Sequence, residues 1–89
     1  MAYFVYILQS KQDGTYYIGH TANLRERVVR HNEGRSSYTR NRLPWVLVYH
    51  ESFETRGEAM SREIEIKSKK NRDSLDQLVR ASRVRLGTL

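Results

Sequence analysis

The stretch from Tyr16 to His31, Y-Y-I-G-H-T-A-N-L-R-E-R-V-V-R-H, decides how this chain is organised. It combines the end of a strand, a glycine that lets the backbone turn, and the start of a helix. Arg27 and His31 are four residues apart and therefore share one face of that helix. With Tyr17 they bring a phenol, a guanidinium and an imidazole together, a set suited to a phosphate group. Taken singly, Arg27 or His31 is more simply a solvated side chain on a helix flank.

The chain before this stretch predicts a β-hairpin. Residues 3–9 (Y-F-V-Y-I-L-Q) are rich in strand-forming side chains and apolar on both faces, as in a central strand. Residues 10–14 contain the Asp-Gly pair of a tight turn, and residues 15–20 return antiparallel. Period-two alternation puts Phe4, Tyr6 and Leu8 on one face of the first strand and groups Tyr17 with Gly19 in the second.

The segments after the hairpin complete an α+β fold. Thr21 or Asn23 suits the cap of a helix that extends to about residue 32, and Gly34 suits the position after its end. Residues 35–44 are irregular, and residues 45–53 (W-V-L-V-Y-H-E-S-F) form the third strand. Because a helix joins strands two and three, these strands lie parallel to each other, on either side of strand one. We predict a single domain over residues 1–89, with a three-stranded antiparallel sheet of order 2-1-3 and topology β-β-α-β-α-α.

A second helix begins with the capping-box spacing of Thr55 and Glu58 and is predicted to reach about residue 70. Its apolar residues are Ala59, Met60, Ile64 and Ile66. Glu63 lies between them on the core-facing side, where a carboxylate is costly unless it is paired or binds a metal. The alternative is an exposed i,i+4 ion pair with Lys67, worth about 0.3–0.5 kcal/mol.

Asp73 is predicted to cap a last helix over about residues 73–85, followed by a frayed tail. Its apolar residues are Leu75, Leu78, Val79 and Leu86, and its basic residues are Arg80, Arg83 and Arg85. Such a helix packs on the domain, pairs with a partner or lies on an anionic lipid surface. Packing is the simplest of the three.

The composition favours a polyanionic partner, because 16 Lys and Arg against 10 Asp and Glu give a formal charge of +6. An arginine-rich surface that reflects only codon bias is the alternative. The lack of cysteine fits a cytoplasmic protein. We find no signal peptide and no apolar span of ~20 residues, so we expect no membrane partner. The candidate DNA contacts on the first helix are Arg25 and Arg30. Those in the irregular segment after it, for which a solvated loop is an equally simple interpretation, are Arg35, Tyr38, Thr39, Arg40 and Arg42.

These motifs together resemble the GIY-YIG nuclease domain, and most closely its small stand-alone bacterial members. The resemblance spans about residues 2–76. It is carried by Tyr17-Ile18-Gly19 followed by N-L-x-x-R-x-x-x-H, by the pair Tyr38-Thr39, by P-W-x-L-V-Y from Pro44, and by E-A-x-x-x-E-x-x-I-K from Glu58 to Lys67.

The resemblance implies a role for each matching position. The family's motif tyrosines fall on Tyr6 and Tyr17, its glycine on Gly19, its helix arginine and histidine on Arg27 and His31, and its metal-binding glutamate on Glu63. The sequence departs from the family in its first motif, where Phe4-Val5-Tyr6 keeps only the tyrosine. For the family's late asparagine, Asn71 is the candidate.

The resemblance therefore implies a divalent-metal-dependent DNA endonuclease that acts in DNA repair or processing. Glu63 holds one Mg²⁺ or Mn²⁺ ion, and Tyr6, helped by Tyr17, accepts the proton of the attacking water. Arg27 stabilises charge on the phosphate, and His31 tunes a tyrosine or the leaving oxygen. Two alternatives stay open: a non-catalytic nucleic-acid-binding module of the same fold, and a protein-interaction domain. RNA as a substrate, a homodimer and a larger repair complex also stay open.

Overall fold

The computed structural model describes residues 2–69 and 71–86, with residues 82–86 as backbone only. Its sheet consists of β1 (Tyr3–Ser10), β2 (Tyr16–Thr21) and β3 (Trp45–Phe53) in the order β2-β1-β3, with β1 antiparallel to both neighbours. The helices are α1 (Leu24–Asn32), α2 (Arg56–Ser68) and α3 (Arg72–Leu86), and a short 3-10 helix spans Arg40–Arg42. The predicted sheet order and topology are confirmed.

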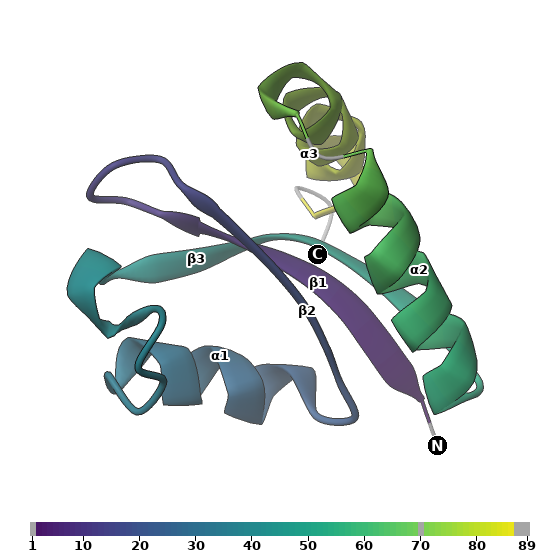
Figure 1. Ribbon diagram of the computed structural model, residues 1–89, viewed down its shortest axis with the longest axis horizontal. Helices are drawn as coiled ribbons and strands as arrows, with labels where there is room; N and C mark the ends of the chain where they lie inside the picture. Colours follow the sequence, from purple (N-terminus) through teal and green to yellow (C-terminus); the bar gives the residue numbers. More distant parts are fainter. Residues whose placement is uncertain (1, 70, 87–89) are drawn as a thin grey trace.

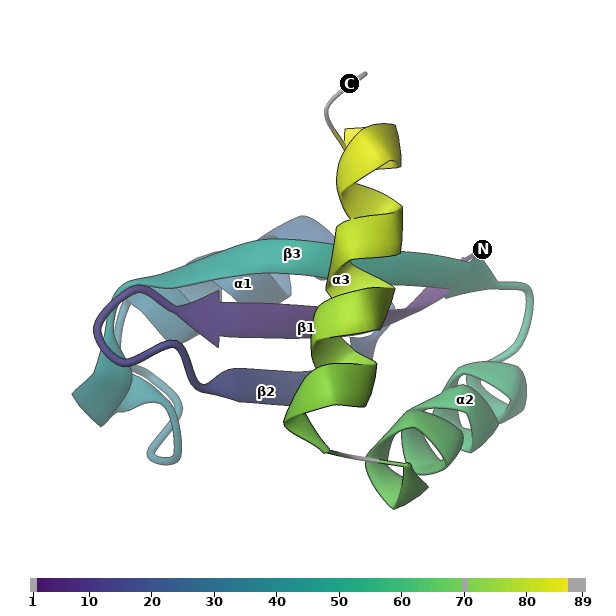
Figure 2. The same cartoon turned by 90° about the horizontal axis from the view of Figure 1, so that it is seen from above.

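The helices cover opposite faces of the sheet: α1 lies on one face, and α2 and α3 lie on the other (Figure 1). Seen from above, α3 crosses the strands while α1 lies behind the sheet (Figure 2). Alternate residues of β1 therefore enter two separate cores. Val5 and Ile7 pack toward α2 and α3, whereas Tyr6 and Leu8 pack toward α1 with Trp45. The central strand is apolar on both faces, as its sequence predicts.

A bulge in the pairing of β1 with β3 lets β3 serve both cores. The register shifts between Ile7, which pairs with Tyr49, and Leu8, which pairs with Leu47. β3 therefore has one extra residue at this point. Beyond it, the side chains of β3 that faced one side of the sheet face the other. Leu47 packs with the α1-side core and Tyr49 with the α2-side core, although both have odd numbers. The sequence pattern had not indicated this bulge.

The hairpin and the ends of α1 follow their local signals. Gly14 in the tight turn and Gly34 after α1 have positive φ angles of 78° and 75°, which a glycine adopts without strain. Asn23 is the N-cap of α1, because its side chain accepts a hydrogen bond from the Glu26 amide. Thr21, the other candidate, is not the N-cap. Its hydroxyl oxygen accepts a hydrogen bond from the Asn23 amide, before the helix begins.

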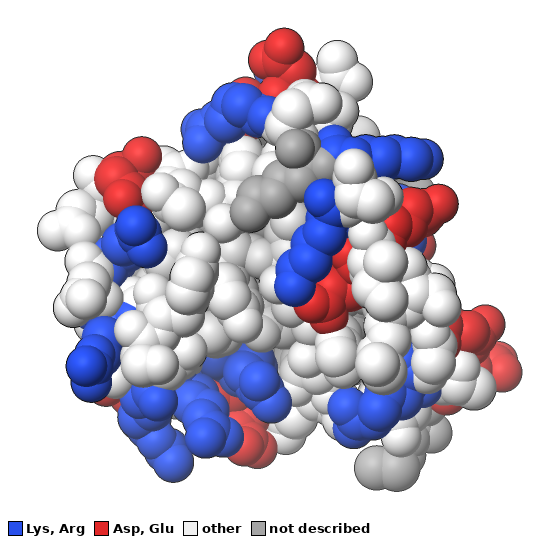
Figure 3. Space-filling model, viewed as in Figure 1, with Lys and Arg blue, Asp and Glu red and all other residues white. Residues whose placement is uncertain are grey.

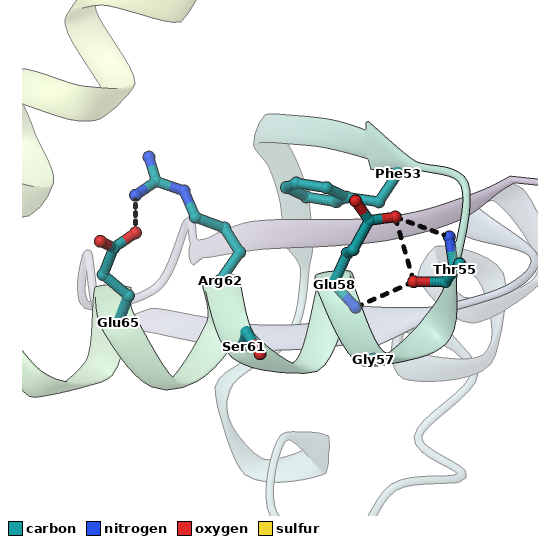
Figure 4. A pocket seen from close by; sticks show the side chains of 7 residues that line it. All are labelled: Phe53, Thr55, Gly57, Glu58, Ser61, Arg62 and Glu65. Carbon is teal, nitrogen blue, oxygen red and sulfur yellow. Dashed lines mark hydrogen bonds and ion pairs between the residues drawn. The ribbon is translucent and has the colours of Figure 1, made fainter.

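The capping box of α2 is confirmed, since the Thr55 hydroxyl accepts from the Glu58 amide and the Glu58 carboxylate accepts from the Thr55 amide (Figure 4). Of the four apolar residues of this helix, only two are buried. Met60 and Ile64 are 43% and 65% exposed, because only Ala59 and Ile66 align with the sheet. The described helix ends at Ser68, and residue 70 lies outside the described residues.

The predicted cap of the last helix is also wrong. Asn71, not Asp73, caps α3: its side chain accepts from the Ser74 amide at 2.8 Å, and Asp73 lies in the first turn. Leu75 and Val79 are buried against the sheet, so this part of the helix packs on the domain as expected. The side chains of Arg83, Arg85 and Leu86 and the tail from residue 87 lie outside the described part. No helix among the described residues has the length and apolar character to cross a bilayer.

Candidate active site

Tyr6 and Gly19 are the first pair of the site. They are direct partners in the ladder between β1 and β2, and the Tyr6 ring lies across the glycine. A Cβ atom at position 19 would be 2.6 Å from the Tyr6 hydroxyl oxygen and 2.8 Å from Cζ. Tyr6 is only 1% exposed, so its ring has no room to move aside. The glycine is therefore required to make room for the Tyr6 phenol. The expectation that it lets the backbone turn is wrong, because Gly19 lies inside β2 and has no positive φ angle.

Three buried polar side chains form a chain of hydrogen bonds behind this pair. The Tyr6 hydroxyl lies 3.3 Å from His31 Nε2, and His31 Nδ1 lies 2.8 Å from Thr39 Oγ1. His31 is 2% exposed and Thr39 is fully buried. Trp45 Nε1 donates to the Thr39 carbonyl at 2.8 Å, which fixes the loop at this point. Both ring nitrogens of His31 are thus held by side chains from separate segments.

The burial of Thr39 corrects one prediction. We expected this threonine to contact DNA, but a side chain with no exposed surface is not available to a ligand. Its hydroxyl instead positions His31. Asn32 adds a second link between α1 and the start of β3, since its amide group exchanges hydrogen bonds of 2.9 and 2.7 Å with the Trp45 backbone.

Tyr17 joins the buried groups to the surface. Its ring centroid is 4.9 Å from that of His31 and 6.3 Å from that of Tyr6. On its outer side the Tyr38 ring lies 5.7 Å away and is 61% exposed. The two motif tyrosines and the helix histidine, which the sequence groups only by resemblance and spacing, are therefore in mutual ring contact.

Burial and charge keep the Tyr6–His31 pair neutral. Burial raises the pKa of Tyr6 well above its usual value, the neighbouring Tyr17 phenol and the negative charge of Glu63 act in the same direction, and the half-buried Arg27 opposes them. Burial lowers the pKa of His31, and the positive charges of Arg27 and Arg30 lower it further. At neutral pH the site therefore contains a phenol and an uncharged imidazole, with a guanidinium beside them.

Glu63 approaches the site from α2 and has both carboxylate oxygens engaged. His20 Nδ1 donates to Oε1 at 2.5 Å and Lys67 Nζ donates to Oε2 at 2.6 Å. The Glu63 side chain is 15% exposed. Burial acts to raise the pKa of this carboxyl, but the hydrogen bonds and charges of Lys67 and His20 together hold it below its usual value. The anticipated pair with Lys67 is present, and His20 is an additional partner.

His20 is the residue that our sequence reasoning overlooked. It follows Gly19 in β2, and alternation places it on the same face as Ile18, which is buried in the α2-side core. The face of α2 that carries Glu63 packs against this side of the strand. Strand periodicity combined with the inward position of Glu63 could therefore have indicated the contact.

Most of the arginines predicted to contact DNA are exposed on α1 and on the connection that follows it. Figure 3 shows Lys and Arg gathered over this lower part of the molecule. Arg35 pairs with Glu33 and Arg42 with Asp13, at 3.3 and 3.2 Å. The exposed members of this basic surface are Arg25, Arg30, Arg35 and Arg40, while Arg42 is half-buried.

The described residues contain no cluster of three or more His, Cys, Asp or Glu side chains that could hold a metal ion. Glu63, bonded to His20 and Lys67, is therefore the one carboxylate that the predicted site residues offer to an ion. Such a donor set fits a hard ion of the Mg²⁺ type, which takes most of its ligands from water and from substrate phosphate. It does not fit zinc, which prefers several nitrogen or sulfur ligands. Asn71 contributes nothing to this set, because its side chain caps α3.

A depression of about 690 Å³, apart from the residues described above, lies over the first turns of α2 (Figure 4). The polar groups that line it bond mainly to one another, through the capping box and the Arg62–Glu65 pair. None of the predicted site residues lines this depression, so we assign it no role. Its lining residues are Phe53, Thr55, Gly57, Glu58, Ser61, Arg62 and Glu65.

Comparison with known proteins identifies the family. The sequence profile of the GIY-YIG catalytic domain matches residues 2–76. A UPF0213 protein of Streptococcus pneumoniae is 46% identical over 68 residues, covering 75% of this chain and 68% of the relative. A UPF0213 protein of Halobacterium salinarum is 47% identical over 64 residues, covering 71% and 82%. The solution NMR structure of the UPF0213 protein BH0048 from Bacillus halodurans superposes with a TM-score of 0.57 at 39% identity, covering 91% of this chain and 85% of that one.

Proposed function

The chain belongs to the GIY-YIG family, whose domains are nucleases, and from this premise we propose that it is a divalent-metal-dependent endonuclease that hydrolyses DNA phosphodiester bonds. The observation that carries the proposal is the convergence of three ring systems, a guanidinium and a carboxylate from separate elements of the fold. Tyr6, Tyr17 and His31 are in ring contact, and Arg27 and Glu63 both act on the Tyr6 phenol.

In the proposed mechanism, Tyr6 takes a proton from the attacking water as it passes its own to His31. The Nδ1–H of a neutral His31 donates to Thr39 Oγ1, which leaves Nε2 as an acceptor for the Tyr6 hydroxyl. The opposed pKa shifts keep this pair neutral in the free protein. Arg27 stabilises the negative charge that develops on the phosphate, and Tyr17 orients the imidazole by ring contact.

Glu63 is the residue that would hold the metal ion, with Mg²⁺ or Mn²⁺ as the proposed ions. When bound, the ion supplies positive charge to the phosphate and to the attacking water. His20 and Lys67 bond to one carboxylate oxygen each, so they fix the direction of the carboxylate and offset its charge until a cation binds. We also propose a cytoplasmic role in DNA processing or repair, which rests on the family and on the cysteine-free sequence.

The partner proposed for the basic surface is the DNA backbone. Arg25, Arg30 and Arg40 are exposed on α1 and in the following connection, beside the segment that positions His31. Guanidinium groups there can bind phosphates on either side of the cut and hold the strand across the site. Phosphate contacts carry no sequence information directly, so we propose that these contacts supply affinity and register.

One observation favours the second candidate function, a non-catalytic nucleic-acid-binding module. Both oxygens of Glu63 are already paired with cations or donors, and such pairing is also a stable end state for a carboxylate that binds no metal. A protein-interaction domain is the third candidate. These candidates differ in metal dependence and in salt dependence, and both can be measured.

The deciding experiment is a nicking assay on single-stranded, duplex, flap and branched DNA with and without Mg²⁺ or Mn²⁺. We expect metal-dependent cleavage by the wild type and none by Glu63→Gln, whose DNA affinity stays near or above that of the wild type because a negative charge is removed. Glu65→Gln, on the exposed side of the same helix, is the matched control and should cleave normally.

The same preparations separate the other two candidates. DNA binding without cleavage by the wild type would leave the binding module. In that case log K should still fall with log salt, at about −0.9 per phosphate contact on duplex DNA. Weak binding that is independent of salt would leave only the interaction domain.

A further inference from the structure

A hollow of about 430 Å³ opens beside the site along β2, which is an edge strand of the sheet. Its walls come from three separate segments of the chain. Tyr16, Tyr17 and Ile18 belong to β2, Tyr38 to the connection after α1, and Lys67 to α2. Since α1 and α2 lie on opposite faces of the sheet (Figure 1), this hollow bridges the two faces at the strand that carries the Y-I-G motif.

Aromatic rings connect this hollow to the reactive groups. Tyr38 is 61% exposed and its ring centroid is 5.7 Å from that of Tyr17, which in turn lies 4.9 Å from His31. The Tyr38 ring is too exposed for its role to be the packing of the core. Tyr38 instead extends the buried aromatic group to the surface and offers a free ring surface next to Tyr17.

The opposite wall carries a positive charge that is tied to the proposed metal-binding residue. Lys67 Nζ is 2.6 Å from Glu63 Oε2, and the Lys67 side chain is 51% exposed. The cation is therefore accessible from the hollow while it remains bonded to the carboxylate. Because this ammonium group lines the hollow and bonds to Glu63, it can contact the phosphate of a nucleotide that occupies the hollow.

We propose that this hollow is a subsite for one unpaired nucleobase next to the phosphate that is cut, and the proposal rests on the proposed function. The base stacks on Tyr38 and Tyr17, and its phosphate contacts Lys67. Ring stacking of this kind accepts any base, because each has a flat π surface. A base inside a duplex is already stacked on its neighbours and cannot enter without being turned out of the helix. The subsite therefore selects DNA with an unpaired nucleotide at one defined position.

The first test is an abasic scan. A single abasic nucleotide is moved along a cleaved substrate, and kcat/KM is measured at each position. For the wild type we expect one position, adjacent to the cut, at which the missing base costs about tenfold or more, which is within the range for loss of one stacked base. Tyr38→Ala should lose a similar factor on the intact substrate and show no further loss at that position, because the two changes remove the same contact.

Two control variants sharpen the scan. Tyr38→Phe keeps the ring and should reproduce the wild-type profile. Val46→Ala removes an exposed apolar side chain from β3, the other edge of the sheet, and should leave the profile unchanged. A flat wild-type profile would overturn the subsite while cleavage, and with it the proposed function, still stands. The same loss at one position in both the wild type and Tyr38→Ala would also overturn it.

The second test does not depend on turnover. The fluorescent base 2-aminopurine is placed at the candidate position, unpaired, and titrated with Glu63→Gln protein. Stacking should quench its fluorescence, and the double variant Glu63→Gln/Tyr38→Ala should bind without quenching. Quenching by Glu63→Gln, combined with no cleavage by the wild type in the nicking assay, would retain the subsite and reject the nuclease. Binding without quenching, or no binding, would overturn the subsite itself.

Discussion

The two faces of the sheet differ in where they keep their polar atoms. On the α2 side the core is mainly aliphatic, and its tyrosine hydroxyls reach partners at the rim: Tyr16 donates to Asp76 and Tyr49 to Glu51. On the α1 side the hydroxyl of Tyr6 and the imidazole of His31 are fully inside. Both faces are built by the same central strand, from alternate residues.

This difference between the two faces explains how a small chain can stabilise its fold and also hold a polar site rigidly. The α2 side buries apolar surface at little polar cost, which is the main favourable contribution to folding. The α1 side must satisfy every polar atom it buries, and among the described residues no buried side-chain donor or acceptor lacks a partner. We infer that the stability of the fold depends mainly on the α2 side. The geometry of the reactive groups depends mainly on the α1 side.

The largest expected effect is on stability. Ile7 and Leu8 are neighbours in β1, both fully buried, and they face the α2 side and the α1 side respectively. Ile7→Ala and Leu8→Ala should each cost about 2–5 kcal/mol, since both remove three buried carbon atoms. Only Leu8→Ala should also lower kcat/KM per folded molecule, because Leu8 pairs with Tyr17 across the strands.

Urea unfolding monitored by circular dichroism and by Trp45 fluorescence gives the folded fraction for this pair of variants. Trp45 is the single tryptophan and lies in the α1-side core, so it reports on that face. An equal fall in kcat/KM for the two variants, after correction for folded fraction, would contradict the division between the faces.

The next effect concerns catalysis directly. In Gly19→Ala the new methyl group meets the Tyr6 hydroxyl at 2.6 Å, and the buried ring must shift. A displacement near 1 Å in a catalytic group can cost about 100-fold in rate. We therefore expect about a 100-fold loss of kcat/KM per folded molecule, together with a loss of stability of about 1–3 kcal/mol from overpacking. Gly57→Ala is the control, because a Cβ there meets nothing within 4 Å, and it should cleave like the wild type.

The contrast between the faces was only partly predictable. The apolar residues at both even and odd positions of residues 3–9 indicated two buried faces, and helical spacing indicated that Glu63 faces the core. Both predictions rest on the periodicity of the sequence, which can be read without knowledge of the tertiary structure. The burial of Thr39 could not be predicted, since it lies in an irregular segment with no period to assign a face. The exposure of Met60, which we had used to define the core-facing side of its helix, could not be predicted either, because hydrophobicity alone does not say which side of a helix meets the sheet.

Two local features, the cap of α3 and the bulge in β3, also could not be predicted from the sequence. Asn71 and Asp73 are both good capping residues, and which one caps depends on where the chain leaves α2. The bulge in β3 depends on matching two cores at once, and no single residue encodes it. Errors of this kind concern the placement of the elements, while their existence and order were predicted correctly.

A smaller effect should follow from Thr39→Val. This change keeps the shape of the side chain and removes the hydroxyl that lies 2.8 Å from His31 Nδ1. The imidazole then loses one of its two partners and its fixed orientation, so we expect about a tenfold lower kcat, equivalent to one hydrogen bond of roughly 1–1.5 kcal/mol. Thr39→Ser should restore the rate. A normal rate in Thr39→Val would mean that Tyr6 and Tyr17 orient the imidazole without the threonine hydroxyl.

The smallest expected effect is the pH dependence that the buried imidazole adds to stability. Burial and the charges of Arg27 and Arg30 lower the pKa of His31 in the folded state, whereas in the unfolded chain it is about 6.5. Below pH 6.5 the unfolded chain therefore binds the proton more readily, and stability that is complete above this pH is lost as the pH falls toward the folded-state pKa. His31→Gln removes this contribution. Urea midpoints measured between pH 7.5 and 5.5 should fall more steeply for the wild type than for His31→Gln, with His20 and His50 common to both proteins. Parallel curves would show that the α1 side accepts a charged imidazole, and the neutral hydrogen-bonded chain from Tyr6 to Thr39 would have to be abandoned.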